Sequence, residues 1–188
     1  MIYTLPKTLE VDGIEREIRT DYRAILDVIA ALNDPELQGF ERAEACIRIM
    51  FPDWQNISDR TEAFAKCMWF VACGEVETSG KKKAKVMDWQ QDFPLIVSPI
   101  NRILGYDCRG VEYLHWWSFV AAFYEIGECA FSCVTSIRQK LAKGKPLEKW
   151  EKAYYSEHAD IIKLKAQLST DEQAEIDEIL GGESFADI

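Results

Sequence analysis

The sequence predicts a mainly α protein, a helical bundle of about six to seven helices with a small N-terminal β-hairpin. Apolar residues recur at helical spacing along most of the chain, capping residues and prolines separate these repeats, and only one short segment alternates as a strand does. With 188 residues the chain has the size of one domain, and it can bury a core without disulfides or a metal.

The hairpin is predicted by Asp12-Gly13, which stands between alternating residues in the segment 8–18. Thr20 or Asp21 then caps a helix that ends at Asn33-Asp34-Pro35, and its apolar face contains Ile25, Val28, Ile29 and Leu32. A second helix is expected over 39–50, with four residues facing inward: Phe40, Ala43, Ile47 and Met50.

Ser58 or Asp59 caps a third helix, whose run FAKCMWFVA is apolar nearly all round and is therefore expected to be central. Residues 74–86 hold two glycines and a cluster of lysines, which predicts an exposed, mobile loop between two halves, 1–73 and 87–168. A nucleic-acid patch is the alternative for KKKAK, but the run is short and has no interleaved aromatic residues.

In the second half, Asp88 or Asp92 starts a helix that Gly105 ends, with Pro94 in its first turn and Pro99 as a kink or a restart. Further helices are expected over 111–127 and 129–142, from about 147, and from about 169. Residues 1–180 then form a single helical domain, and 181–188 form a frayed acidic tail.

The segment Asp107 to Phe119, DCRGVEYLHWWSF, is predicted to be the structural centre. On a helix, Tyr113, Trp116, Trp117, Val120 and Tyr124 share one face, and His115 and Phe119 share an adjacent one. A ligand pocket is one reading, and a buried core with a polar network is the favoured one. The candidate partners for its polar groups are Asp92, Asp107, Arg109 and Arg138.

Arg138 is a charged residue in the otherwise apolar run FSCVTSIRQK. An unpaired buried charge costs several kcal/mol, so we predict an ion pair between Arg138 and either Asp92 or Asp107.

No constellation indicates catalysis. Cys129 and Cys133 lie four residues apart, but neither a CxxC pair nor a second ligand pair accompanies them. No cysteine carries a nucleophile signature, and phosphate-binding and hydrolase motifs are absent. Asp88 and Asp92 fit helix capping better than acid–base catalysis. We expect no enzyme activity, no cofactor and no metal site.

The net charge of −10 would repel nucleic acid, and no apolar run is long enough to span a membrane. The N-terminus lacks a basic region followed by an apolar run, so no signal peptide is expected. We therefore expect a reducing cytoplasm, in which the six cysteines are small core residues. They are Cys46, Cys67, Cys73, Cys108, Cys129 and Cys133.

The second half of the chain contains an aspartate, then G-x-D, then HWW-x-F, then I-R, in this order. The residues concerned are Asp92, Ile96, Gly105, Asp107, Leu114, His115, Trp116, Trp117, Phe119, Ile137 and Arg138. On these residues the chain, over 5–165, resembles the bacteriophage gene-product-fifteen family, from the tail-morphogenesis module of long-tailed phages and prophages. One departure is Pro99, where that family more often has a helix-friendly residue.

The resemblance implies a tail assembly chaperone in the bacterial host cytoplasm. Its partners would be the tape measure protein and the tail-tube protein, and a homo-oligomer is a further expectation. The alternative is a minor structural component, such as a completion or connector protein, that remains in the virion. The resemblance supplies no functional residues, so the partner-binding surface stays open at this point.

Overall fold

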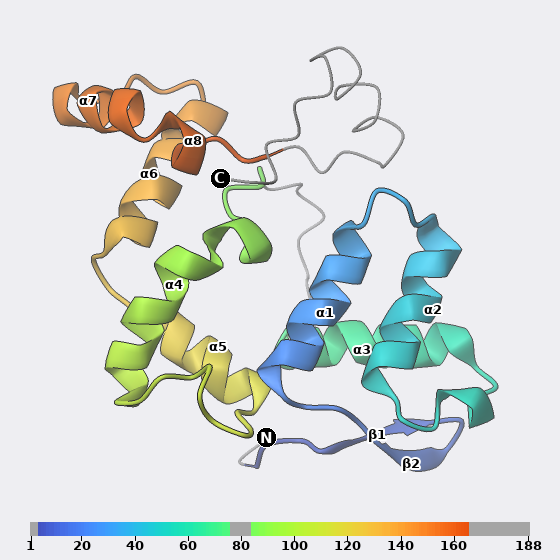
Figure 1. The fold of residues 1–188 in the computed structure, drawn as a ribbon. Coiled ribbons are helices and arrows are strands. Elements are labelled where there is room, and N and C mark those ends of the chain that lie inside the picture. The colour runs from blue at the N-terminus through green and yellow to red at the C-terminus, as the bar shows by residue number, and fades with distance from the viewer. Residues whose placement is uncertain (1–3, 76–83, 166–188) are drawn as a thin grey trace, which may run out of the picture.

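The structure is a computed structural model that describes residues 4–75 and 84–165. It confirms the mainly helical fold with one two-stranded hairpin (Figure 1). Within these two ranges it has two strands, eight α-helices and one 3-10 helix, with these bounds: β1 Thr8–Val11, β2 Ile14–Glu17, α1 Tyr22–Asn33, α2 Gly39–Met50, η1 Trp54–Asn56, α3 Arg60–Val71, α4 Trp89–Leu104, α5 Trp116–Tyr124, α6 Ala130–Ala142, α7 Lys149–Glu157 and α8 Ala159–Ile162.

The hairpin forms where the sequence predicts it. Asp12 and Gly13 both have positive φ, 57° and 69°, as a two-residue type I′ turn requires, and Val11 pairs with Ile14 beside the turn. β1 packs on α3. The Asp12 carboxylate also accepts hydrogen bonds from the backbone N–H groups of Ser58 and Asp59, each at 2.8 Å. These two bonds lower the pKa of Asp12 and anchor the turn to the start of α3.

Helices α1, α2 and α3 form one side of the molecule, with the hairpin against their ends (Figure 1). Of the capping alternatives, Asp21 caps α1 and Asp59 caps α3, each through its carboxylate. α2 has the predicted bounds, but the expectation that Phe40 faces inward is wrong, because its side chain is 76% exposed. Phe40 is in the first turn of α2, next to the exposed α1–α2 loop.

α4 begins at Trp89, and the carboxylate of Asp88 accepts the N–H groups of the first turn. Pro94 therefore lies inside the helix and not in its first turn, and the helix continues through Pro99 without a restart. A proline donates no backbone hydrogen bond, so each weakens the helix locally. Gly105 ends α4 in the left-handed conformation, with φ 78°, as predicted.

α5 begins at Trp116, five residues later than the sequence predicts. The two residues before it, Leu114 and His115, pair with the start of α1. Tyr22 N donates to the Leu114 carbonyl oxygen at 2.9 Å, and Leu114 N donates to the Asp21 carboxylate, also at 2.9 Å. Tertiary hydrogen bonds thus replace the helix that aromatic spacing favoured.

The main core contains buried residues from the hairpin, α1 to α5 and the start of α6. A second, smaller core lies between α6 and α8 and is built on Val134, Ile137 and Ile162. In the described ranges no helix has the length and apolar character to cross a membrane. The lysine run 81–83, the helix expected from 169 and the tail 181–188 lie outside those ranges.

Candidate functional site

The two tryptophans of the central motif cap the end of α3. Trp116 Nε1 donates to the Val71 carbonyl oxygen at 2.9 Å, and Trp117 Nε1 donates to the Phe70 carbonyl oxygen at 3.0 Å. The last carbonyls of a helix lack partners within it, and the Trp116 indole supplies a donor to that of Val71. The Phe70 carbonyl oxygen also accepts the Cys73 N–H at 3.0 Å, so the Trp117 indole is a second donor to it. The charged side chains expected as partners are not used here. Residue spacing cannot identify a backbone acceptor on a distant helix.

His115 is the N-cap of α5 and is buried. Its Nδ1 accepts the Trp117 N–H at 3.1 Å, and its Nε2 lies 3.0 Å from the Pro6 carbonyl oxygen. Both contacts are satisfied together only by a neutral ring that carries its proton on Nε2. Burial lowers the pKa of His115, in keeping with the neutral form. The side chain therefore ties the N-terminal segment to the motif and is not free for catalysis.

The aromatic face is narrower than the spacing predicted. Phe119 is fully buried and stacks on Tyr22, with ring centroids 4.5 Å apart. Tyr113 and Tyr124 are 50% and 77% exposed, so their assignment to a buried face is wrong. Tyr113 precedes the helix and its hydroxyl lies 2.7 Å from the Thr20 hydroxyl, whereas Tyr124 is the last residue of α5.

The predicted ion pair of Arg138 is confirmed, and its partner is Asp92. The guanidinium makes two hydrogen bonds to the carboxylate, at 2.7 and 2.9 Å, and both side chains are buried. Its remaining N–H groups donate to the carbonyl oxygens of Val86, Ile161 and Ile162. This pair joins α4 to α6 and to the chain around α8, and its complete set of partners indicates a structural role.

Asp107 and Arg109 are exposed and pair with each other. The Arg109 guanidinium donates to the Asp107 carboxylate at 2.7 and 3.0 Å and holds the pKa of that carboxyl well below its usual range. Asp107 is thus not the partner of Arg138. The structure brings together His115, Trp116 and Phe119 in the core, packs the partly buried Trp117 against it, and leaves the Asp107–Arg109 pair at the surface.

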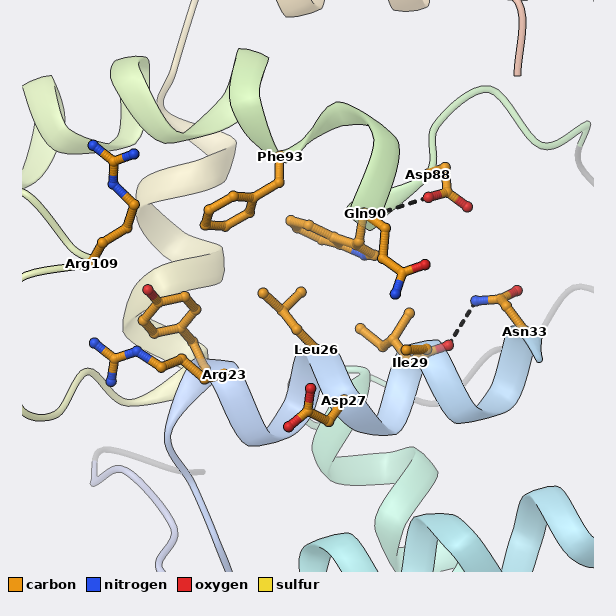
Figure 2. Close-up of a pocket in the computed structure, with 12 residues that line it drawn as sticks. Arg23, Leu26, Asp27, Ile29, Asn33, Asp88, Gln90, Phe93 and Arg109 are labelled. Carbon is orange, nitrogen blue, oxygen red and sulfur yellow. Dashed lines mark hydrogen bonds between the residues drawn. The ribbon is translucent and has the colours of Figure 1, made fainter. Parts of the chain in front are cut away.

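A groove of about 470 Å³ lies between α1 and α4 and is the strongest candidate for a binding site (Figure 2). Figure 2 shows Phe93 extending from α4 toward Leu26 of α1, with Ile29 beside it. α1 uses Ile25 and Val28 for the main core, and its neighbouring face remains partly open. The lining is mainly apolar and includes Leu26, Ile29, Ala30, Trp89 and Phe93.

Polar side chains stand at the two ends of this groove. Arg23 and Arg109 lie at one end, and Asp88, Gln90 and Asn33 lie at the other (Figure 2). Asp88 is already matched by the Lys85 ammonium at 2.8 Å. An apolar floor with polar ends suits the apolar face of an amphipathic helix.

A second hollow of about 370 Å³ adjoins the groove, since Ile29 and Trp89 line both. Its other walls include Val71, Val120 and Phe123. The apolar surface therefore continues from α1 and α4 past Trp89 to α3 and α5.

The groove between α1 and α4 is not predicted from the sequence, although the sequence contains one signal for it. Leu26 and Ile29 extend the apolar stripe of α1 beyond the width that one neighbouring helix covers, and Trp89 and Phe93 are spaced i, i+4 on α4. When two helices far apart in the sequence each have a wide apolar face, part of that apolar surface is expected to remain uncovered by the core. They do not show whether the two faces meet.

The cysteines are thiols with no disulfide among them. Cys46, Cys67 and Cys108 are buried, and Cys73, Cys129 and Cys133 are partly buried. Over residues 4–75 and 84–165, no group of three or more histidine, cysteine or acidic side chains is placed to hold a metal ion.

No curated protein and no solved structure matches the chain. The model of the family described as Bacteriophage Gp15 protein matches residues 1–164. That match covers the hairpin, the groove, the aromatic motif and the Asp92–Arg138 pair, and the chain therefore belongs to the Bacteriophage Gp15 protein family.

Proposed function

We propose that this phage protein is a tail assembly chaperone that binds the tape measure protein through the groove between α1 and α4. The apolar groove is the observation that carries the proposal. Its floor of Leu26, Ile29, Trp89 and Phe93 is aliphatic and aromatic, and α1 alone supplies a wall about 18 Å long for a twelve-residue helix.

The expected ligand has matching chemistry. A tape measure protein, as the family resemblance implies, is a long helical chain that presents apolar stripes before the tail tube encloses it. Covering such a stripe removes apolar surface from water, which is the main driving force for association of this kind. The acidic surface of the chain, with net charge −10, would keep the complex soluble. The proposal is thus of a binding protein and not of an enzyme.

The test is co-expression of the chain with the tape measure protein of the same phage or prophage. We expect the soluble fraction of the tape measure protein to rise and the two proteins to co-purify. Phe93→Asp should abolish both effects because it places a charge on the groove floor. Phe40→Asp is the matched control, since Phe40 is an exposed aromatic residue on α2 outside the groove.

Circular dichroism must show that both variants remain folded. Equal loss of binding in Phe93→Asp and Phe40→Asp, or no co-purification by the native chain, would contradict the proposal. Mass spectrometry of purified virions tests the alternative of a structural tail component. A chaperone should be absent or present in traces, whereas stoichiometric amounts would identify a retained component.

A further inference from the structure

The end of the described chain lies beside one end of the groove. The backbone N–H of Lys165 donates to Gln91 Oε1 at 2.9 Å, and Gln91 Nε2 donates to the Lys163 carbonyl oxygen at 2.7 Å. Lys165 also lines a hollow with Asp88 and Gln90, and both of these residues line the groove as well. The chain that follows Lys165 therefore starts at the groove entrance.

The sequence beyond this point has the composition of a groove ligand. Ser169-Thr170-Asp171-Glu172 is a helix start signal, and Ile176, Ile179 and Leu180 then recur at i, i+3, i+4 before Gly181-Gly182. This is a short amphipathic pattern with one aliphatic stripe.

Its length suits the groove. The five residues 166–170 can span up to about 17 Å when extended. A helix over the ten residues 171–180 would be about 15 Å long, and the twelve residues of α1 extend for about 18 Å.

Charge does not decide the fit, which rests on the apolar stripe. Residues 171–188 contain seven acidic side chains and no basic ones. Arg23 and Arg109 stand at the end of the groove away from Lys165 (Figure 2), and each pairs with an aspartate, Asp21 and Asp107. Two carboxylates, Asp27 and Asp88, also line the groove, and the charge of Asp88 is matched by Lys85.

We propose that residues 171–180 bind the groove of their own chain, with Ile176, Ile179 and Leu180 against Leu26, Trp89 and Phe93. The segment then competes with an incoming partner helix, and this competition rests on the proposed function. A partner must displace it, so binding is reserved for a ligand with a longer or better-matched apolar stripe. A groove occupied for about 90% of the time would bind its partner about tenfold more weakly.

The docking is tested in the full chain with no partner present. A photoreactive phenylalanine analogue replaces Ile179, and mass spectrometry maps its cross-links. We expect links within one chain to α1 around Leu26 or to α4 around Phe93. The same probe at Glu178, on the opposite side of the helical pattern, is the matched control and should give few such links. Links from both positions, links elsewhere, or links between two copies would each overturn the proposal.

The competition is tested with the double variant I176D/I179D. Its affinity for the tape measure protein should rise about tenfold over the native chain, and an unchanged or lower affinity overturns the competition. The two proposals fail differently. If the cross-links form but the tape measure protein does not bind, only the proposed function is refuted. If the tape measure protein binds strongly but no cross-links form, only the self-docking is refuted.

Discussion

Replacing Arg138 with methionine should destabilise the protein strongly. The substitution keeps most of the apolar length of the side chain but removes all its N–H groups. The buried carboxylate of Asp92 then loses both hydrogen bonds from Arg138 and keeps the one from Asp88 N. The carbonyl oxygens of Val86, Ile161 and Ile162 each lose a donor as well. Breaking a buried pair from one side costs about 3–5 kcal/mol, and the midpoint of thermal unfolding should fall by about 6–20 °C.

Urea denaturation followed by tryptophan fluorescence and by circular dichroism measures this loss. Arg109→Met is the matched control, because Arg109 makes an equally bidentate pair with Asp107 on the exposed surface, and its free energy of unfolding should stay near the native value. The double variant D92L/R138M should recover part of the loss, since no buried charge remains. A loss below about 1 kcal/mol in Arg138→Met would refute the reasoning.

Three further predictions concern single positions. Gly105→Ala should lower the free energy of unfolding by about 1 kcal/mol, because φ at this position is 78° and a side chain is strained there even though no atom crowds the added Cβ. Gly39→Ala, in the first turn of α2, is the control and should not lower the free energy of unfolding. An equal loss in both variants would contradict the role of the positive φ. Burial lowers the pKa of His115, so the unfolded chain binds a proton more readily, and stability should fall as the pH drops from about 7 toward the folded pKa. His115→Asn keeps a side-chain acceptor for the helix cap and should reduce the dependence of the free energy of unfolding on pH, as measured by urea titrations at several pH values. If the pH dependence persists in this variant, His115 is not its cause. Burial raises the pKa of Cys46 to about 11 and that of Cys67 still further. An alkylating reagent at about pH 8 should therefore label neither thiol in the native protein and both thiols in urea. Rapid labelling of the native protein would contradict their burial.

Local chemistry made several elements predictable. The Asp12-Gly13 turn, the bounds of α2 and the left-handed Gly105 follow from short-range signals that need no knowledge of the fold. The Arg138–Asp92 pair was predictable for another reason, because a charge within an apolar helix must find a counter-charge.

Long-range contacts explain the failures. The start of α5 is fixed by hydrogen bonds between Leu114 and the beginning of α1, which outweigh the helical spacing of the aromatic residues. The groove depends on how α1 and α4 face each other, and Phe40 is exposed because no neighbour covers the first turn of α2. Periodicity identifies which faces are apolar, whereas only the tertiary arrangement decides which of them are covered.

The caps that Trp116 and Trp117 provide for α3 have a consequence during synthesis on the ribosome. The donors stand 45 and 47 residues after the carbonyls that they satisfy, and His115 reaches back 109 residues to Pro6. At roughly 5–20 residues per second, about 2–9 s separate the emergence of α3 from that of its caps. During this interval the nascent N-terminal helices lack the stacking surface of Phe119, so the step that completes their core is the arrival of α5.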